Sequence, residues 1–581
     1  MSQLLLPTVE EADVQPAPRD EANAGQSYLE SLPRATRRAH GRVYTPEHLV
    51  SFILDLAGYR VDAALDRISL LDPACGAGAF LVGSLVRLAQ HFRRRGVPIT
   101  TSRGATRFLR AVERNLFGVD MDAEACALAR GAVQTMTANL IHPQLVPSEF
   151  FVANVHHEDF LSVDEADAPS VDFIVGNPPY VPTTRLSAPV KNDYRQRFRT
   201  ANGRIDLYVL FFERGLERLG ENGTLAFITP NKVLTTASAA PLRDLLRDQA
   251  HIRTIAEFSS HKVFPEAATI PCITVIERNE SKPSQHEVEY YRCISSEEQV
   301  RVTHRSRHRL PEGEWRLSEP EVTRLVEALR NRHRPLSDRV ARISAGIATG
   351  RDSIYVLPTS QAEKLGLERA LRHPAIRGKD VGVETIAASN LDIIVPYIDD
   401  EHGTPKLVDL EDFPNVARYL AKNRQELGKR HCVRTWKKAW YDLHDPWKTN
   451  IAAHTKILVP DVAFSNRFAM DDEKRCPLHS CYFLVPNVDE DVAYLTAVLN
   501  SVPIEFCVRA TAPVVKDGFV RYRKQFLAPL PIPEATALQR KRFVGARNRR
   551  KATMDLFGLS SEDMEAMEAF IERSRTSHLD A

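Results

Sequence analysis

The chain has 581 residues, which is too long for one compact hydrophobic core, so we expect two or three domains. Its hydrophobic content of 43% and charged content of 26% are ordinary for a globular protein, and no run of about 18 apolar residues predicts a membrane span. Eight scattered cysteines favour reduced thiols, so we expect a cytoplasmic protein without a membrane partner.

The first part of the chain has the pattern of a tail followed by a sheet domain. Residues 1–40 are rich in acids and prolines, and we expect a disordered or accessory N-terminal tail. Strand and helix candidates then alternate, which predicts an α/β fold with a doubly wound parallel sheet. The strand candidates are 68–72, 116–120, 149–155, 172–177 and 224–230, and the helix candidates are 79–92 and 205–220.

Composition changes along the chain suggest the remaining boundaries. We expect a catalytic domain over 41–285, a connecting segment over 286–334, an α+β domain over 335–535 and a helical tail over 536–581. A longer insert at about 93–115 interrupts no motif, and its role is open.

A glycine-rich turn follows the first strand candidate. In "LLDPACGAGAF", Asp72 ends the strand and Gly76 and Gly78 form a turn before a helix. Glycines let the backbone approach a ligand closely, because they have no Cβ. Such a turn by itself would also suit a dinucleotide, but the spacing here is not that of the six-residue dinucleotide fingerprint.

Two further strand ends carry acidic residues. Asp120 in "GVDMD" could accept hydrogen bonds from two ribose hydroxyls. Asp159 and Phe160 in "HHEDF" could bond an adenine amine and pack on its ring. Each acid alone could equally be a helix cap, but acids at successive strand ends favour one shared ligand site.

The stretch "VDFIVGNPPYVP" ends a strand in Asn177, Pro178, Pro179 and Tyr180. Ligands bind beyond the carboxyl ends of strands in open α/β sheets, so this tetrapeptide is a candidate catalytic element. Pro179 lacks an N–H donor and restricts Pro178, so the Pro178 carbonyl is held outward with little competition.

Together these motifs resemble the amino-methylating DNA methyltransferases, and their order resembles the gamma class, or Taq-type adenine methyltransferases. The upstream "GRVYTPEHLV" resembles the family motif that lines the methionine end of the cofactor. The resemblance implies a seven-stranded, Rossmann-like methyltransferase domain with S-adenosyl-L-methionine as cofactor. The cofactor-binding residues it implies are Thr45, Asp72, Gly76, Gly78, Asp120, Asp159, Phe160 and Pro179.

The same resemblance implies a role for the tetrapeptide. Asn177 and the Pro178 carbonyl would hold both hydrogens of a base amine and localise its lone pair, while Tyr180 stacks on the base. The base must be flipped out of the duplex to reach such a site. Phe264 in "HKVFPEA" is the candidate for the opposite face of the base, and its alternative is a core residue.

The C-terminal half resembles a target-recognition domain. Basic clusters with interleaved aromatics, such as 429–440, favour nucleic acid, although most charge clusters are solvated surface. The candidate DNA contacts are Arg351, Lys379, Arg430, Lys437, Lys438, Arg521 and Lys524. We reject a zinc site at Cys476, His479 and Cys481, because no second ligand pair has zinc spacing.

We therefore expect a sequence-specific N6-adenine DNA methyltransferase that protects host DNA. Its expected partners are double-stranded DNA and, genetically, a separate cognate restriction endonuclease, because residues 1–40 are too few for a fused nuclease domain. The family resemblance favours a monomer. The alternatives are an N4-cytosine DNA methyltransferase, a protein-glutamine methyltransferase and a catalytically silent DNA-binding protein; Asn at the first tetrapeptide position favours adenine.

Overall fold

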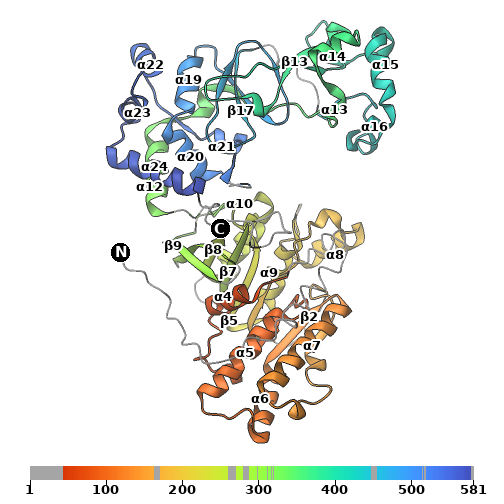
Figure 1. The fold of residues 1–581 in the computed structure, drawn as a ribbon, viewed down its shortest axis with the longest axis vertical. Coiled ribbons are helices and arrows are strands. Elements are labelled where there is room, and N and C mark those ends of the chain that lie inside the picture. Colours follow the sequence, from red (N-terminus) through yellow and green to blue (C-terminus); the bar gives the residue numbers. More distant parts are fainter. Residues whose placement is uncertain are drawn as a thin grey trace. The chain divides into compact units, whose positions relative to one another are not determined.

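The computed structural model describes residues 44–162, 170–203, 205–258, 263, 270–278, 287–296, 299–310, 312–315, 317, 319–445, 454–512, 515 and 518–576. The chain forms two compact units that divide after Leu317 (Figure 1). The N-terminal tail at 1–40 and Phe264 lie outside the described residues.

The first unit is built on a nine-stranded sheet in the order β3-β2-β1-β4-β5-β7-β6-β8-β9. The first five strands of this order, β3, β2, β1, β4 and β5, run parallel to one another. Strand β7 runs antiparallel to its two neighbours, β5 and β6. The strands are β1 Leu70–Asp72, β2 Leu116–Asp120, β3 Val155–His157, β4 Val171–Gly176, β5 Leu219–Pro230, β6 Ala250–Phe258, β7 Pro271–Arg278, β8 Val288–Ser295 and β9 Val300–His308.

The expected α/β fold is confirmed, and the sheet has two more strands than the seven expected. Strand β8 pairs parallel with β6, and β9 pairs antiparallel with β8. Residues 286–334, expected as a connecting segment, therefore contribute two strands to the sheet and also the helix α12 Pro320–Arg332 to the second unit.

The strand expected over 149–155 is wrong. Phe151 has φ of 68°, residues Val152–Asn154 form a 3-10 turn, and β3 begins only at Val155. Phe150 and Phe151 are buried in the hydrophobic core. The side chains of this apolar run therefore reach the core from a turn, and its backbone does not pair with a strand. A short apolar run alone does not distinguish these two outcomes.

Helices cover both faces of this sheet (Figure 1). They are α4 Glu47–Ala57, α5 Ala79–Arg94, α6 Ser102–Asn115, α7 Ala123–Leu140, α8 Ala188–Arg197, α9 Leu207–Arg218, α10 Lys232–Thr235 and α11 Ala240–Gln249. Successive strand residues point to opposite faces, so Val175 joins the core under α4 and α5 while Ile174 joins the core under α9. The insert at 93–115 contains α6, which the Thr101 side chain caps at its N-terminus.

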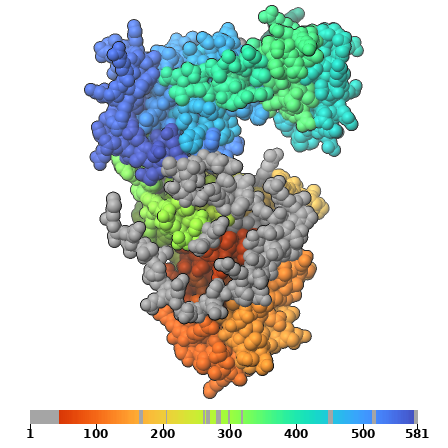
Figure 2. All heavy atoms as spheres, in the orientation of Figure 1, coloured from red at the N-terminus to blue at the C-terminus, as the bar shows by residue number. Residues whose placement is uncertain are grey.

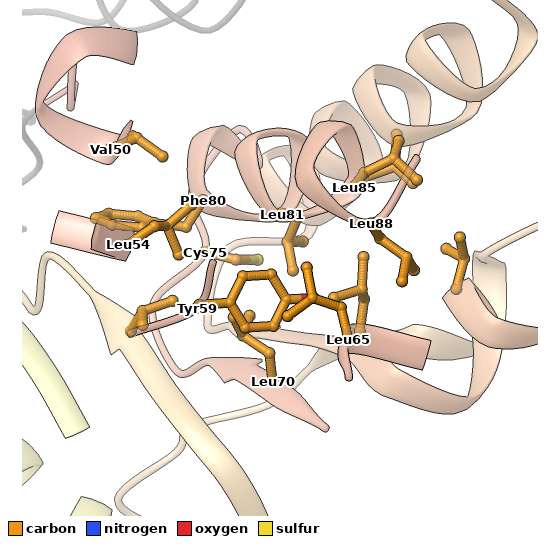
Figure 3. Packing of buried hydrophobic residues seen from close by; sticks show 14 of the residues in the cluster. Val50, Leu54, Tyr59, Leu65, Leu70, Cys75, Phe80, Leu81, Leu85 and Leu88 are labelled. Atoms are coloured by element: carbon orange, nitrogen blue, oxygen red, sulfur yellow. The ribbon is translucent and has the colours of Figure 1, made fainter. Parts of the chain in front are cut away.

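The core under α5 supports the glycine-rich turn. Figure 3 shows apolar side chains of α5 directed toward neighbours below the helix, with Cys75 of the turn among them: Tyr59, Leu65, Leu70, Cys75, Phe80, Leu81, Leu85 and Leu88. Burial of this cluster holds the end of β1 and the start of α5 in one place.

The second unit contains two four-stranded sheets, β11-β21-β17-β19 and β12-β14-β13-β20, and two hydrophobic clusters. Its strands are β10 Arg334–Pro335, β11 Val340–Ala345, β12 Val356–Pro358, β13 Arg372–Ile376, β14 Leu391–Ile394, β15 Tyr397–Asp399, β16 Pro405–Leu407, β17 Lys456–Pro460, β18 Val462–Ala463, β19 Ala469–Asp471, β20 Cys476–Pro477, β21 Cys481–Pro486, β22 Val520–Arg521 and β23 Pro531–Ile532. Besides α12, its helices are α13 Asp352–Tyr355, α14 Thr359–Lys364, α15 Pro414–Lys422, α16 Arg424–Gly428, α17 His431–Arg434, α19 Val492–Leu499, α20 Val502–Thr511, α21 Lys524–Leu527, α22 Ala537–Val544, α23 Arg549–Phe557 and α24 Ser561–Thr576.

Within the described residues, no single helix has the length and apolar composition needed to cross a membrane. The bent pair α19 and α20 meets that test only when the two helices are taken together, and most of their residues are buried in the protein core.

Candidate active site

Three strands deliver polar residues to one edge of the sheet. Asp72 is the last residue of β1, Asp120 is the last residue of β2, and Asn177 directly follows β4. Strand β1 lies between the other two and is parallel to both, so the three carboxyl ends lie at the same edge. This is the arrangement that the motif order predicts.

The glycine-rich turn is tied to Asp120. The backbone N–H of Gly76 donates to Asp120 Oδ2 over 2.9 Å, and that of Asp122 donates to Asp120 Oδ1 over 2.9 Å. Gly78 has φ of 88°, and a Cβ there would lie 3.0 Å from the backbone of Ala129 on α7. The glycine at 78 is thus required by both its left-handed backbone and close helix packing.

Asp72 is a buried carboxyl group. It is 1% exposed, and its Oδ1 accepts a hydrogen bond from the Ala74 N–H over 3.2 Å. Burial raises the pKa of Asp72 to about 8; the Ala74 bond opposes this shift and the nearby Asp120 charge adds to it. A cationic ligand group beside Asp72 would favour the charged carboxylate.

Asn177 is oriented by a residue far away in the sequence. Its Nδ2 donates to Thr45 Oγ1 over 3.1 Å, and Thr45 is 5% exposed just before α4. The Asn177 Oδ1 atom is buried, and it has no hydrogen-bond partner among the described residues. A buried acceptor without a partner is unusual, and a donor on a bound ligand would satisfy it.

Tyr180 is held at both its hydroxyl and its ring. The hydroxyl donates to the Ile228 carbonyl over 3.1 Å, and the ring meets Tyr208 edge-on at 6.4 Å. Burial raises the pKa of Tyr180 well above its usual value, so the hydroxyl stays protonated. Pro178 is buried and Pro179 is half-buried beside it.

Asp159 and Phe160 make hydrogen bonds and packing contacts within the protein that the sequence did not suggest. Asp159 Oδ1 accepts from the Leu161 N–H over 3.0 Å, and its Oδ2 accepts from Ser162 Oγ over 2.8 Å. Phe160 is 4% exposed and packs on Phe211 with ring centroids 5.5 Å apart. Asp159 therefore organises a local turn at this strand end, and no helix begins at the described residues that follow it.

One neighbour of Asp159 was missed in the sequence. The hydroxyl of Tyr194 on α8 lies 3.5 Å from Asp159 Oδ2. Burial is the main cause that raises the pKa of Tyr194, and the negative charge of Asp159 adds to it. A tyrosine in a polar helix carries no specific sequence signal, so only the fold could identify this contact.

The cationic candidates in the second unit differ in exposure. Arg430 is 6% exposed and donates to the carbonyls of Leu427, Thr349 and Trp440, so it is a structural residue. Lys438 donates to the Leu443 and His444 carbonyls, and Arg521 pairs with Asp461 over 3.2 Å. The exposed candidates are Arg351, Lys379, Lys437 and Lys524.

Cys476, His479 and Cys481 differ in their environments. Both cysteines are buried in the apolar core, while His479 is exposed and its Nδ1 lies 3.3 Å from Asp352 Oδ2. Across the part of the chain that the structure describes, no group of three or more His, Cys, Asp or Glu residues is arranged to hold a metal ion.

Two segments of the chain match known families. Residues 114–264 match the Eco57I restriction-modification methylase family, and residues 373–532 match the TaqI-like C-terminal specificity domain. The chain is also 27% identical over 564 residues to the Type II methyltransferase M.PaeR7I of Pseudomonas aeruginosa, covering 91% of this chain and 93% of that protein. These two matches and this relative support a Taq-type restriction-modification methylase.

Other proteins similar to this chain are also methyltransferases or restriction-modification enzymes. It is 27% identical over 541 residues to the Type II methyltransferase M.BstVI of Geobacillus stearothermophilus, covering 88% of this chain and 93% of that protein. A solved structure of the Type IIL restriction-modification enzyme MmeI in complex with DNA aligns with a TM-score of 0.61 and 14% identity, covering 97% of this chain and 82% of that chain. At that identity the likeness shows the fold alone.

The methylase uses S-adenosylmethionine as cofactor, and the residues at the sheet edge fit it. The buried Asp72 suits a cationic group, and the strand-end Asp120 suits hydroxyls. The family match begins at residue 114, so Thr45, Asp72 and Gly76 lie outside the matched segment and their roles rest on geometry.

Proposed function

We propose that this methylase transfers a methyl group to N6 of an adenine that is flipped out of double-stranded DNA at a specific sequence. The observation that carries the proposal is the buried Asn177 Oδ1 atom, which lacks a partner among the described residues while Thr45 holds the other end of the amide. That atom is an acceptor prepared for an amine hydrogen.

The proposed chemistry depends on the geometry of the amine. The lone pair of an exocyclic amine is delocalised into the base, so the nitrogen is a poor nucleophile. Asn177 Oδ1 and the Pro178 carbonyl each accept one amine hydrogen, which localises the lone pair on nitrogen. Orientation and electrostatics then supply most of the rate enhancement, and no strong general base is needed.

The flipped base needs two flanking surfaces. Tyr180 supplies one, because its hydrogen bond to Ile228 and its contact with Tyr208 fix the ring after the second proline. Phe264 supplies the other; this assignment rests on the sequence motif. Stacking is worth about 1–3 kcal/mol per base, which offsets much of the cost of flipping.

The cofactor side of the site follows from the same edge of the sheet. S-adenosylmethionine, when bound, supplies an electrophilic methyl group. Asp72 and Thr45 are proposed to face its methionine end, while Asp120 accepts from ribose hydroxyls and Asp159 accepts from the adenine amine. Phe160 packs beside the adenine, and Gly76, Gly78 and Pro179 allow close approach of the backbone.

The test is modification mapping of unmethylated plasmid DNA that has been incubated with the protein and S-adenosylmethionine. The expected result is N6-methyladenine at one recurrent sequence, with no modification by the Asn177→Ala variant. N4-methylcytosine in the product would replace adenine as the target base. Unmodified DNA despite cofactor binding would overturn the proposal.

The biological partners are also part of the proposal. A methylase of this type protects DNA from a separate cognate restriction endonuclease, and we propose that it acts as a monomer on one strand at a time. Sedimentation of the protein with its target duplex should give one protein per site. Plasmid modified in vitro should resist the restriction enzyme that recognises the mapped sequence.

A further inference from the structure

A tryptophan is unusually exposed in the second unit. Trp436 lies just after the short helix α17, and it is 52% exposed. Its ring lies against the rings of His431, at 5.3 Å between centroids, and His444, at 4.9 Å. Large aromatic side chains that a fold holds toward solvent are favoured at binding surfaces. In Figure 2, residues in the range 400–440, which are coloured teal, form part of the surface of this unit.

The backbone around Trp436 is held firmly by a buried cation. Arg430 donates Nη1 to the Thr349 carbonyl over 2.9 Å and Nη2 to the Trp440 carbonyl over 2.7 Å. A Cβ on Gly350 would lie 3.1 Å from His444 Cβ, so the loop near Thr349 packs tightly against the support of the tryptophan ring. Trp436 is therefore presented by a built scaffold.

The next residue adopts a conformation that side chains rarely take. Lys437 has φ of 58°, in the left-handed region that glycine or asparagine usually occupies. It sits in a turn in which the N–H groups of Trp436 and Lys438 both bond to the Cys432 carbonyl, each over 3.2 Å. A lysine in this conformation costs stability, because its Cβ is crowded by the backbone.

Cationic residues flank the tryptophan in the chain. Arg434 and Lys437 are exposed, and neither has an ion-pair partner among the described residues. Lys429 and Arg351 lie in the same region and share Glu426 as their ion-pair partner. Exposed cations beside an exposed aromatic ring match the phosphates and bases of a nucleic acid.

We propose that Trp436 and Lys437 form a DNA-contacting tip in the specificity domain. In this arrangement Trp436 stacks on a base that is exposed by distortion of the duplex, while Lys437 neutralises a neighbouring phosphate. The inference rests on the proposed function, because base flipping is what distorts the duplex. It assigns an energetic role in target binding to two residues outside the catalytic domain.

The chain offers a matched control for Lys437. Lys474 is also exposed and also has a left-handed backbone, with φ of 57°. It follows the acidic run "DDE" at 471–473, and its neighbour Arg475 is paired with Glu473. Changing either lysine to asparagine removes one charge at a position where asparagine is well tolerated, so neither change should impair folding.

The experiment measures equilibrium binding of the full-length protein to a short duplex that carries the mapped target, between about 50 and 200 mM salt. Trp436→Ala should weaken binding about 5- to 150-fold, while Trp436→Phe should retain most of it. Lys437→Asn should reduce the steepness of the log-log salt dependence by about 0.9, and Lys474→Asn should leave it unchanged. All four variants should unfold at the wild-type temperature within a few degrees.

Two outcomes would overturn the proposal. One is binding by Trp436→Ala and Lys437→Asn that equals binding by Lys474→Asn. The other is an equal loss of binding in all three variants, because a loss that also occurs at the control position does not come from a DNA contact made by Trp436 or Lys437. Methylation by the wild-type protein, measured in parallel, distinguishes the two proposals. If the wild type methylates DNA and the Trp436 and Lys437 variants bind DNA normally, only this inference is overturned. If the wild type does not methylate DNA, the proposed function is overturned.

Discussion

Asn177 Nδ2 donates to Thr45 Oγ1 over 3.1 Å, which joins the residue after β4 to the residue two positions before α4. This bond decides which end of the Asn177 amide remains available. Because the nitrogen is used by Thr45, the oxygen is left as the acceptor in the site.

Thr45→Val should therefore slow methyl transfer. Valine keeps the shape of threonine but cannot accept the bond from Asn177, so the amide loses its orientation. One net hydrogen bond is worth about 1 kcal/mol, which corresponds to a roughly 5- to 10-fold lower single-turnover rate. Thr45→Ser keeps the hydroxyl and should restore most of the rate. A valine variant as fast as wild type would show that the bond is not used.

Asn177→Ala should remove methyl transfer and leave DNA binding largely intact. Loss of one group that stabilises a transition state costs about 10²–10³ in rate, and here the same group also holds the substrate amine. Single-turnover rates and duplex binding should be measured on the same preparation. Comparable losses of rate and of binding would instead point to a role in recognition.

Gly176→Ala should damage the site through Asp72. A Cβ at Gly176 would lie 2.8 Å from Asp72 Oδ1 and 3.4 Å from Pro73 Cδ. Relief of that contact must move a buried carboxyl group, so we expect about 1–3 kcal/mol lower free energy of unfolding and weaker S-adenosylmethionine binding. Calorimetric unfolding and titration measure both quantities.

Gly131→Ala is the matched control for that change. Gly131 lies in α7, and a Cβ there would have no neighbouring heavy atom within 4 Å. Alanine favours the helix, so the free energy of unfolding should rise by about 0.5–1 kcal/mol. If both alanine variants behaved alike, steric crowding at Gly176 would not be the cause.

Asp72 should make the stability of the cofactor-free protein depend on pH. Its pKa is about 8 in the folded state, against about 3.9 in an unfolded chain. Between these values the folded protein holds a proton that the unfolded chain has released, so the free energy of unfolding decreases as pH rises. The slope is at most about 1.4 kcal/mol per pH unit.

Asp72→Asn isolates this contribution. The amide cannot ionise and its oxygen can still accept from the Ala74 N–H. Relative to wild type, the variant should become progressively more stable from about pH 5 to pH 8 in denaturant titrations. A constant difference over that interval would mean that Asp72 is already ionised in the folded protein.

The sequence determined the parts of this protein that local chemistry specifies. Strand β2 has the expected bounds, and β1 ends at the expected Asp72, because each short apolar run ends at an acidic residue. Helix α5 begins directly after Gly78, where the glycine-rich turn ends. The doubly wound order follows from alternating strands and helices. The motifs also placed Asp72, Asp120 and Asn177 at strand ends, where the structure has them.

Only the tertiary structure decided what depends on contacts between distant residues. The same basic cluster supplied Arg430, which the fold buries against three carbonyls, and Lys437, which it exposes beside Trp436. Composition cannot separate these two, because burial of a cation depends on the acceptors that other segments bring to it. For the same reason, the Thr45 partner of Asn177, the Tyr194 contact with Asp159 and the strands β8 and β9 emerged only when the chain was folded.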